Sequence, residues 1–145
     1  MVSTVILVDD HAVFRDALCA FLEQQTDLKV IAQTGSGQTG CALAEEYRPD
    51  VVVVDIELPD LGGLAVTEAV QRLSRPPRVL ILSVYAEATH WAQAVAAGAA
   101  GYICKDESGA RLVQAIRTVA QGGTYFPTAG GQSPDPQGRP LRIRS

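Results

Sequence analysis

Val51-Val52-Val53-Val54-Asp55 is the stretch that decides the fold of this 145-residue chain. Four consecutive β-branched residues predict a strand that is buried on both faces, as in parallel sheets covered by helices. A carboxylate at the end of such a strand is costly unless a charged or hydrogen-bonding group meets it. Because open α/β sheets also bind ligands at their strand ends, we interpret Asp55 as the centre of a functional site.

Strand and helix patterns alternate along the chain as far as residue 120. Apolar, β-branched runs predict strands at residues 4–8, 28–34, 51–55, 78–83 and 101–104. Apolar residues at helical spacing predict a helix from residue 11, with Asp10 in position to be its N-cap, and helices over residues 64–73, 86–97 and 107–120. Residues 35–47 are predicted to form a turn and then a helix. Five strands alternating with five helices predict an α/β fold, a doubly wound parallel sheet with helices on both faces.

The composition indicates a folded protein in the cytoplasm. Hydrophobic residues make up 47% of the chain and charged residues 19%, which excludes a wholly disordered chain. No apolar run reaches the roughly 18 residues of a membrane helix, and the N-terminus shows no secretory pattern. Residues 1–128 hold 9 basic and 15 acidic groups, so the body is a poor electrostatic match for nucleic acid. We therefore expect neither a membrane nor a nucleic-acid partner for this chain.

The cysteines and histidines give no sign of metal or redox chemistry. Cys19, Cys41 and Cys104 are an odd number, widely spaced and in apolar contexts, so we interpret them as buried small hydrophobic residues. His11 and His90 are expected to be ordinary surface or cap residues.

Five polar residues fall at the carboxyl ends of predicted strands: Asp9, Asp10, Asp55, Ser83 and Lys105. In a parallel sheet these ends share one edge, so residues scattered over the chain should converge on one site. At about 4 Å and an effective dielectric of about 20, each pair of carboxylates repels by about 4 kcal/mol. The site should therefore hold a proton or bind a cation, and its oxygen ligands suit Mg²⁺.

The same residues suit acceptance of a phosphoryl group. An ionised Asp55 has no proton to lose and could attack phosphorus directly, giving an acyl phosphate. Mg²⁺ and Lys105 would neutralise the transferring oxygens, and Ser83 offers a hydroxyl donor.

Over about residues 2–124 the chain resembles the receiver domain of bacterial two-component response regulators. The resemblance is carried by Asp9-Asp10, Asp55, Pro59 and Gly63 in the following loop, Ser83, and Tyr102 three residues before Lys105. It implies a flavodoxin-like sheet in the order 2-1-3-4-5. It also implies a sensor histidine kinase as phosphoryl donor and a signalling switch whose only chemistry is its own phosphorylation and dephosphorylation.

The resemblance implies a role for each matching residue. Asp55 is the expected phosphoacceptor, and Mg²⁺ is expected to bind Asp10, Asp55 and the backbone carbonyl of Glu57, with Asp9 acting through water. Lys105 is expected to contact the phosphoryl group. Ser83 and Tyr102 are expected to form the switch, since Ser83 would move toward the phosphoryl group and vacate space for the Tyr102 ring.

The segments at residues 83–85, 101–106 and 122–126 most resemble the NarL/LuxR-type branch, which is linked to transcription regulation and usually carries a helix-turn-helix. We expect a receiver domain over residues 1–124 and a flexible, linker-like tail over 125–145 without an effector domain. Asp106 stands where many receivers have proline and is interpreted as a cap of the last helix. A homodimer through that helix is a further family expectation.

Two other interpretations compete with a receiver. Residues 35–40 read Gly-Ser-Gly-Gln-Thr-Gly, a literal dinucleotide fingerprint after a strand, although it lies on the second strand and leaves Asp9, Asp10, Ser83 and Lys105 unexplained. Asp55-Ile56-Glu57 also resembles the paired acids of Mg²⁺-dependent haloacid-dehalogenase-type phosphotransferases and phosphatases. The earlier pair Asp9-Asp10 and the lack of room for a substrate cap argue against that interpretation.

Overall fold

The computed structural model describes residues 1–84 and 88–126. Its strands are β1 (Ser3–Val8), β2 (Leu28–Thr34), β3 (Val51–Asp55), β4 (Arg78–Ser83) and β5 (Gly101–Cys104). Its helices are α1 (Ala12–Glu23), α2 (Gly37–Tyr47), α3 (Gly63–Gln71), α4 (Ala88–Ala97) and α5 (Gly109–Ala120). The alternation confirms the predicted α/β class. Predicted helical residues 86 and 87, and the tail from residue 127, lie outside the described residues.

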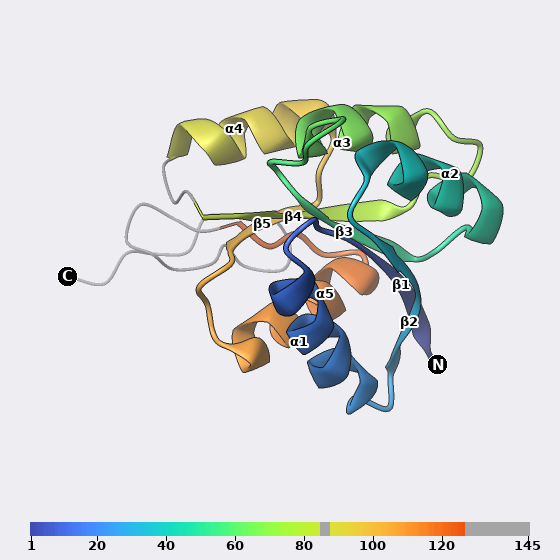
Figure 1. The fold of residues 1–145 in the computed structure, drawn as a ribbon, viewed down its shortest axis with the longest axis vertical. Helices are drawn as coiled ribbons and strands as arrows, with labels where there is room; N and C mark the ends of the chain where they lie inside the picture. Colours follow the sequence, from blue (N-terminus) through green and yellow to red (C-terminus); the bar gives the residue numbers. More distant parts are fainter. Residues whose placement is uncertain (85–87, 127–145) are drawn as a thin grey trace.

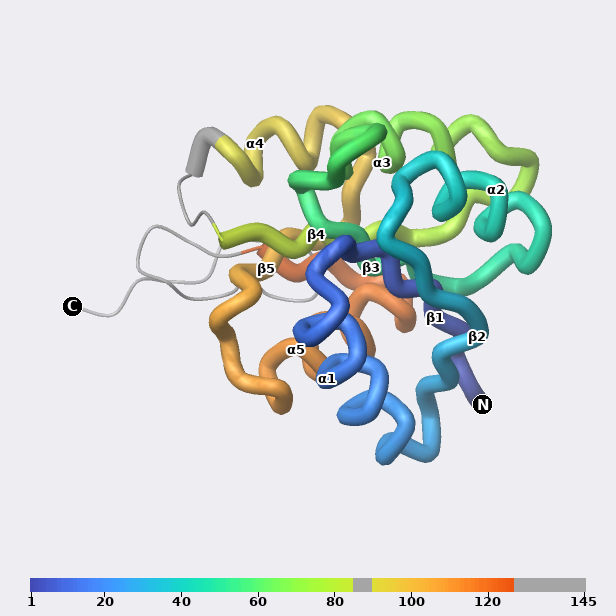
Figure 2. Tube along the Cα trace, in the orientation of Figure 1, coloured from blue at the N-terminus to red at the C-terminus, as the bar shows by residue number. Residues whose placement is uncertain are grey.

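The strands form one parallel sheet in the order β2-β1-β3-β4-β5, which confirms the order that the family resemblance implied. Helices α1 and α5 cover one face of the sheet, and α2, α3 and α4 cover the other (Figure 1). In the tube view α1 and α5 again lie side by side below the sheet (Figure 2). All carboxyl ends of the strands therefore meet at one edge, where the loops to α1, α3, α4 and α5 begin.

The β3 strand is the centre of the core. Its four valines are all fully buried, and alternation along the strand sends them to opposite faces. Val51 and Val53 join the apolar cluster under α1 and α5, while Val52 and Val54 join the cluster under α2, α3 and α4. Burial on both faces is what the unbroken valine run predicts for a central parallel strand.

Two predicted helix caps are wrong. His11, not Asp10, occupies the N-cap position of α1, because the strand ends at Val8 as predicted but the helix begins one residue later, at Ala12. Its backbone N–H donates to Oδ1 of Asp9 at 2.9 Å. At α5 the cap is Ser108, whose hydroxyl oxygen accepts from the backbone N–H of Arg111 at 3.2 Å, so Asp106 lies outside the helix in a turn.

The packed part of the chain reaches beyond the last helix. The backbone N–H of Tyr102 donates to the carbonyl of Tyr125 at 2.8 Å, and the N–H of Tyr125 donates to the carbonyl of Ala100 at 3.0 Å. Tyr125 is buried, and Phe126 packs against the cluster that holds Tyr102. These two residues of the predicted tail therefore cover the outer edge of β5.

Cys19, Cys41 and Cys104 are free and half-buried rather than fully buried as predicted. Cys19 and Cys41 lie at the margins of the two apolar clusters, and Cys104 is the last residue of β5. No helix within residues 1–84 and 88–126 is long and apolar enough to cross a membrane.

Candidate functional site

The predicted acidic cluster forms at the carboxyl edge of the sheet. Asp9 and Asp10 follow β1, and Asp55 ends the neighbouring strand β3. Ligand atoms of Asp9, Asp10, His11 and Asp55 all lie within 4.8 Å of one another. Asp9 is 2% exposed and Asp55 3% exposed, whereas Asp10 is open to solvent. Two buried carboxylates and one accessible carboxylate thus share one small site.

Lys105 brings a positive charge into this cluster from the loop after β5. Its Nζ atom lies 2.8 Å from Oδ2 of Asp9 and 3.2 Å from Oδ2 of Asp55. The ring of Phe14 faces the same ammonium group, with its centroid 4.5 Å away. The backbone N–H of Lys105 also donates to the carbonyl of Ser83 at 2.8 Å. The lysine is therefore held at both its backbone and its charged end.

Opposing effects act on the Asp55 carboxyl group. Burial raises the pKa of Asp55 above its usual value, and the nearby charge of Asp9 adds to that rise. A hydrogen bond from the N–H of Glu57 to Oδ1 of Asp55, at 3.1 Å, lowers it, as does Lys105. The net direction is upward, so an added cation would favour the charged carboxylate.

The loop after Asp55 is closed tightly against the end of β3. The N–H of Gly63 donates to the carbonyl of Ile56 at 2.9 Å. A Cβ atom on Gly63 would collide with the carbonyl oxygen of Asp55 and lie 2.7 Å from Cα of Ile56. Glycine at position 63 therefore allows α3 to begin directly beside the candidate site.

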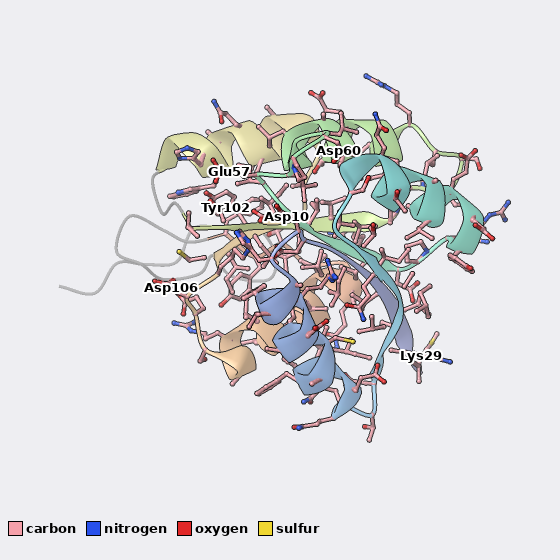
Figure 3. The ribbon with its side chains drawn as sticks, in the orientation of Figure 1. Asp10, Lys29, Glu57, Asp60, Tyr102 and Asp106 are labelled. Carbon is pink, nitrogen blue, oxygen red and sulfur yellow. The ribbon has the colours of Figure 1, made fainter. Side chains whose placement is uncertain are left out.

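Ser83 and Tyr102 lie on the two strands farther along the sheet. Ser83 is fully buried at the end of β4, and Tyr102 is 1% exposed on β5. The β4–β5 register places Ser83 opposite Cys104 and Ile81 opposite Tyr102. Asp10, Glu57 and Tyr102 all lie toward the carboxyl end of the sheet, whereas Lys29 lies toward the other end (Figure 3).

His11 belongs to the site, in contrast to the ordinary surface or cap role predicted for it. Its side chain is 62% exposed, yet Nδ1 lies 3.3 Å from Oδ1 of Asp9 and 3.5 Å from Oδ2 of Asp55. The same nitrogen lies 2.7 Å from Nζ of Lys105. Its place directly after Asp9-Asp10 is the sequence signal that could have found it. Phe14, one helical turn after Asp10, gave no such signal because it fits the apolar face of a helix.

The comparison with protein families decides between the interpretations. The model of the response regulator receiver domain matches residues 5–117. The chain belongs to this family. Receiver domains are signalling switches of two-component systems, phosphorylated by histidine kinases, and bind Mg²⁺ in an acidic pocket. The haloacid-dehalogenase interpretation gains no support.

Individual receiver proteins agree with this assignment. The chain is 39% identical over 122 residues to the transcriptional regulatory protein MctR of Rhizobium johnstonii, covering 84% of this chain and 57% of MctR. It is 37% identical over 128 residues to the virulence regulator BvgA of Bordetella pertussis, covering 88% of this chain and 61% of BvgA. The chain thus spans little more than half the length of these curated relatives.

Solved structures show the same fold. The signal receiver domain of NarL from Mycobacterium tuberculosis superimposes with a TM-score of 0.80 at 30% identity, covering 83% of this chain and 98% of that one. A LuxR-family response regulator from Aurantimonas gives 0.83 at 29% identity, covering 90% and 92%. The predicted similarity to the NarL/LuxR-type branch is confirmed.

Proposed function

We propose that this receiver domain accepts a phosphoryl group on Asp55 from the phosphohistidine of a sensor histidine kinase. The single observation that carries the proposal is the contact at 3.2 Å between Nζ of Lys105 and Oδ2 of Asp55 at a shared acidic edge. A buried carboxylate next to a lysine, with further carboxylates for a metal, is what phosphoryl acceptance needs. The family's use of Mg²⁺ and histidine kinases supports the proposal.

The donor set fits Mg²⁺. Side-chain oxygens of Asp9, Asp10 and Asp55 come together within 4.8 Å, and hard oxygen ligands suit this ion. Among the described residues, Lys105 is the lysine or arginine that pairs with these carboxylates, so the cluster keeps an excess of negative charge. In our proposal Asp10, Asp55 and the backbone carbonyl of Glu57 bind the metal directly, and Asp9 acts through water. When bound, Mg²⁺ would neutralise oxygens of the transferring group.

The proposed transfer needs no general base. A carboxylate oxygen of Asp55 forms a bond to phosphorus, while the phosphorus–nitrogen bond of the donor breaks and its electron pair returns to the imidazole nitrogen. The ammonium group of Lys105 then pairs with the phosphoryl oxygens in place of the Asp55 carboxylate. The product is an acyl phosphate on Asp55 that carries about −1.5 to −2 charge.

The proposed switch uses Ser83 and Tyr102. The phosphoryl oxygens are strong acceptors, so the Ser83 hydroxyl moves to donate to one of them. This movement frees space beside β4 that the Tyr102 ring enters from β5. Because both side chains are buried, the change shifts the population between two packings of the surface around α4 and α5.

The proposed output follows from the relatives. Several of them are named as transcription regulators, and we propose that this receiver likewise serves transcription regulation. Residues 127–145, which follow the packed Tyr125 and Phe126, would then act as the linker. Helix α5, whose outward residues Arg111 and Gln114 are exposed, is the proposed surface for a homodimer.

Phosphoramidate is a direct test of the proposed acceptor because it offers the same phosphorus–nitrogen bond as phosphohistidine. The chain is incubated with phosphoramidate and Mg²⁺, and any acyl phosphate is reduced with borohydride and located by peptide mass mapping. We expect the reduced residue at position 55. Reduction at another aspartate, with Asp55 intact, would contradict the assignment.

A further inference from the structure

The glycine-rich turn before α2 binds an internal anion. Three donors at the start of the helix point at the carboxylate of Asp60. The N–H of Gly37 donates to Oδ1 at 2.9 Å, and the N–H of Gln38 donates to Oδ2 at 3.0 Å. The hydroxyl of Ser36 donates to Oδ2 at 2.8 Å and in turn accepts from the N–H of Thr39. Both oxygens of Asp60 are therefore engaged.

This arrangement explains the dinucleotide-like motif at residues 35–40. The first N–H groups of a helix have no partner inside the helix and favour an anion. In dinucleotide-binding proteins that anion is a phosphate, whereas here it is a side chain of the same chain. Hydrogen bonds from Gln38, Gly37 and Ser36 hold the pKa of Asp60 well below its usual value.

Gly37 makes the close approach possible. A Cβ atom at this position would collide with the carbonyl oxygen of Leu61 and lie 3.0 Å from Cβ of Leu61. Any larger residue at position 37 would push the loop after β3 away from α2. Glycine at position 37 thus allows the start of α2 to pack directly against the backbone of the loop after β3.

Asp60 lies in the loop that carries one proposed metal ligand. Glu57, whose carbonyl is the proposed ligand, stands three residues earlier. The ends of the loop are fixed by bonds from Glu57 N–H to Asp55 and from Gly63 N–H to Ile56. Asp60 ties the middle of the loop to α2.

The turn before α2 also touches the segment that carries the other metal-binding carboxylates. A Cβ atom on Gly35 would lie 3.3 Å from Cα of Asp10 and 3.3 Å from Nη1 of Arg15. Arg15 in turn donates from Nη1 to the carbonyl of Asp9 at 2.5 Å. Residues 35–38 therefore stand between the two loops whose spacing sets the geometry of the proposed metal site.

We infer that Asp60 is a positioning residue of the metal site, which fixes the loop of Glu57 against α2 so that its carbonyl stays in place for Mg²⁺. The inference rests on the proposed function. A loop that is already ordered loses less conformational freedom when the ion binds. Removing Asp60 should therefore weaken Mg²⁺ binding without removing any ligand.

Calorimetric titration of the full chain with Mg²⁺ alone tests this inference. We expect Asp60→Ala to raise the Kd for Mg²⁺ by about tenfold, which is about 1.4 kcal/mol. Asp60→Asn keeps one acceptor oxygen, so its Kd for Mg²⁺ should lie between those of the wild type and Asp60→Ala. At saturating Mg²⁺ the rate of phosphorylation by acetyl phosphate should recover, because the loss lies in metal binding.

Asp50→Ala is the matched control. Asp50 is also an exposed loop carboxylate, and it accepts from the N–H of Thr4 at 2.8 Å and from its hydroxyl at 3.2 Å. It precedes β3, at the opposite end of the sheet from the site. This variant removes comparable hydrogen bonds, but its Kd for Mg²⁺ should match that of the wild type.

The outcomes separate the inference from the proposed function. Mg²⁺ binding that needs Asp10 but is equal in wild type and Asp60→Ala would overturn the inference alone. An equal loss in Asp50→Ala would also overturn it, because general destabilisation would then explain the effect. Equal binding by wild type and Asp10→Asn would overturn the proposed function and the inference with it.

Discussion

Nζ of Lys105 lies 3.2 Å from Oδ2 of Asp55, although fifty positions separate the two residues in the sequence. The same ammonium group lies 2.8 Å from Oδ2 of Asp9. One cation thus holds together two buried carboxylates that would otherwise repel. A phosphoryl group on Asp55 would compete with Asp9 for this lysine, so the contact links the state of Asp55 to the loop between β5 and α5.

Lys105→Ala should keep Mg²⁺ binding but slow phosphorylation. Removal of the ammonium leaves the carboxylates more negative, so the Kd for Mg²⁺ should not rise. The rate of phosphorylation by acetyl phosphate at saturating Mg²⁺ should fall by at least about tenfold, or about 1.4 kcal/mol of barrier. Lys29→Ala, an exposed lysine on β2 toward the other end of the sheet, serves as control. An unchanged rate of phosphorylation in Lys105→Ala would contradict the proposed contact between Lys105 and the phosphoryl group.

Ser83→Ala should permit phosphorylation while weakening the response. The hydroxyl is absent, so the phosphoryl group loses a donor, but the nucleophile and the metal ligands remain. The response is measured as the change in hydrogen exchange over β5 and α5 on phosphorylation. In Ser83→Ala most of this change should be absent. Ser74→Ala, an exposed serine in the loop after α3, should respond as the wild type does. A full response in Ser83→Ala would argue against the proposed switch.

Gly63→Ala should destabilise the fold next to the site. The added methyl group would meet the carbonyl of Asp55 and Cα of Ile56, and overpacking against backbone costs about 1–3 kcal/mol. Urea unfolding measures the loss. Gly62→Ala is the matched control, since its Cβ atom would lie 3.7 Å from the carbonyl oxygen of Ile56, an ordinary contact. Equal stability of the two variants would refute the steric argument.

Asp60 should stabilise the fold in a pH-dependent way. Hydrogen bonds hold the pKa of Asp60 below its ordinary value of 3.8 in the folded protein. Such a group adds stability above the unfolded-state pKa and loses it as the pH falls toward the folded-state pKa. The gap in urea midpoint between wild type and Asp60→Ala should therefore be widest above about pH 5 and narrow below pH 3.8. A gap that stays constant on acidification would contradict this account.

The sequence was sufficient to predict the fold class because the residues that mark each strand and helix lie within that element or next to it. The valine run of β3 and the glycine and proline residues between elements mark each strand and helix, and parallel connection rules then leave few topologies. The strand order came from the family resemblance. The α5 cap was not predictable because aspartate and serine both suit such a position, and only the path of the backbone decides between Asp106 and Ser108. The α1 cap was not predictable because His11 makes no side-chain cap hydrogen bond, whereas the neighbouring Asp10 is a typical cap residue.

The site was predictable to the extent that it lies at strand ends. Asp9, Asp10, Asp55 and Lys105 come together because strand ends share an edge. His11 was missed because an exposed histidine at a helix start also fits a plain cap. Asp60 was missed because its partners, Ser36 to Gln38, lie at the start of α2, and no sequence pattern links a loop residue to the start of a helix more than 20 positions earlier in the chain.

The measurement that tests the central claim most directly is the intact mass of the chain after incubation with acetyl phosphate, with and without Mg²⁺, for wild type and Asp55→Asn. We expect one adduct of about 80 Da, the mass of a single phosphoryl group, which requires both Mg²⁺ and Asp55. An adduct of the same size on folded Asp55→Asn, or none on folded wild type with Mg²⁺, would contradict the assignment of Asp55 as phosphoacceptor.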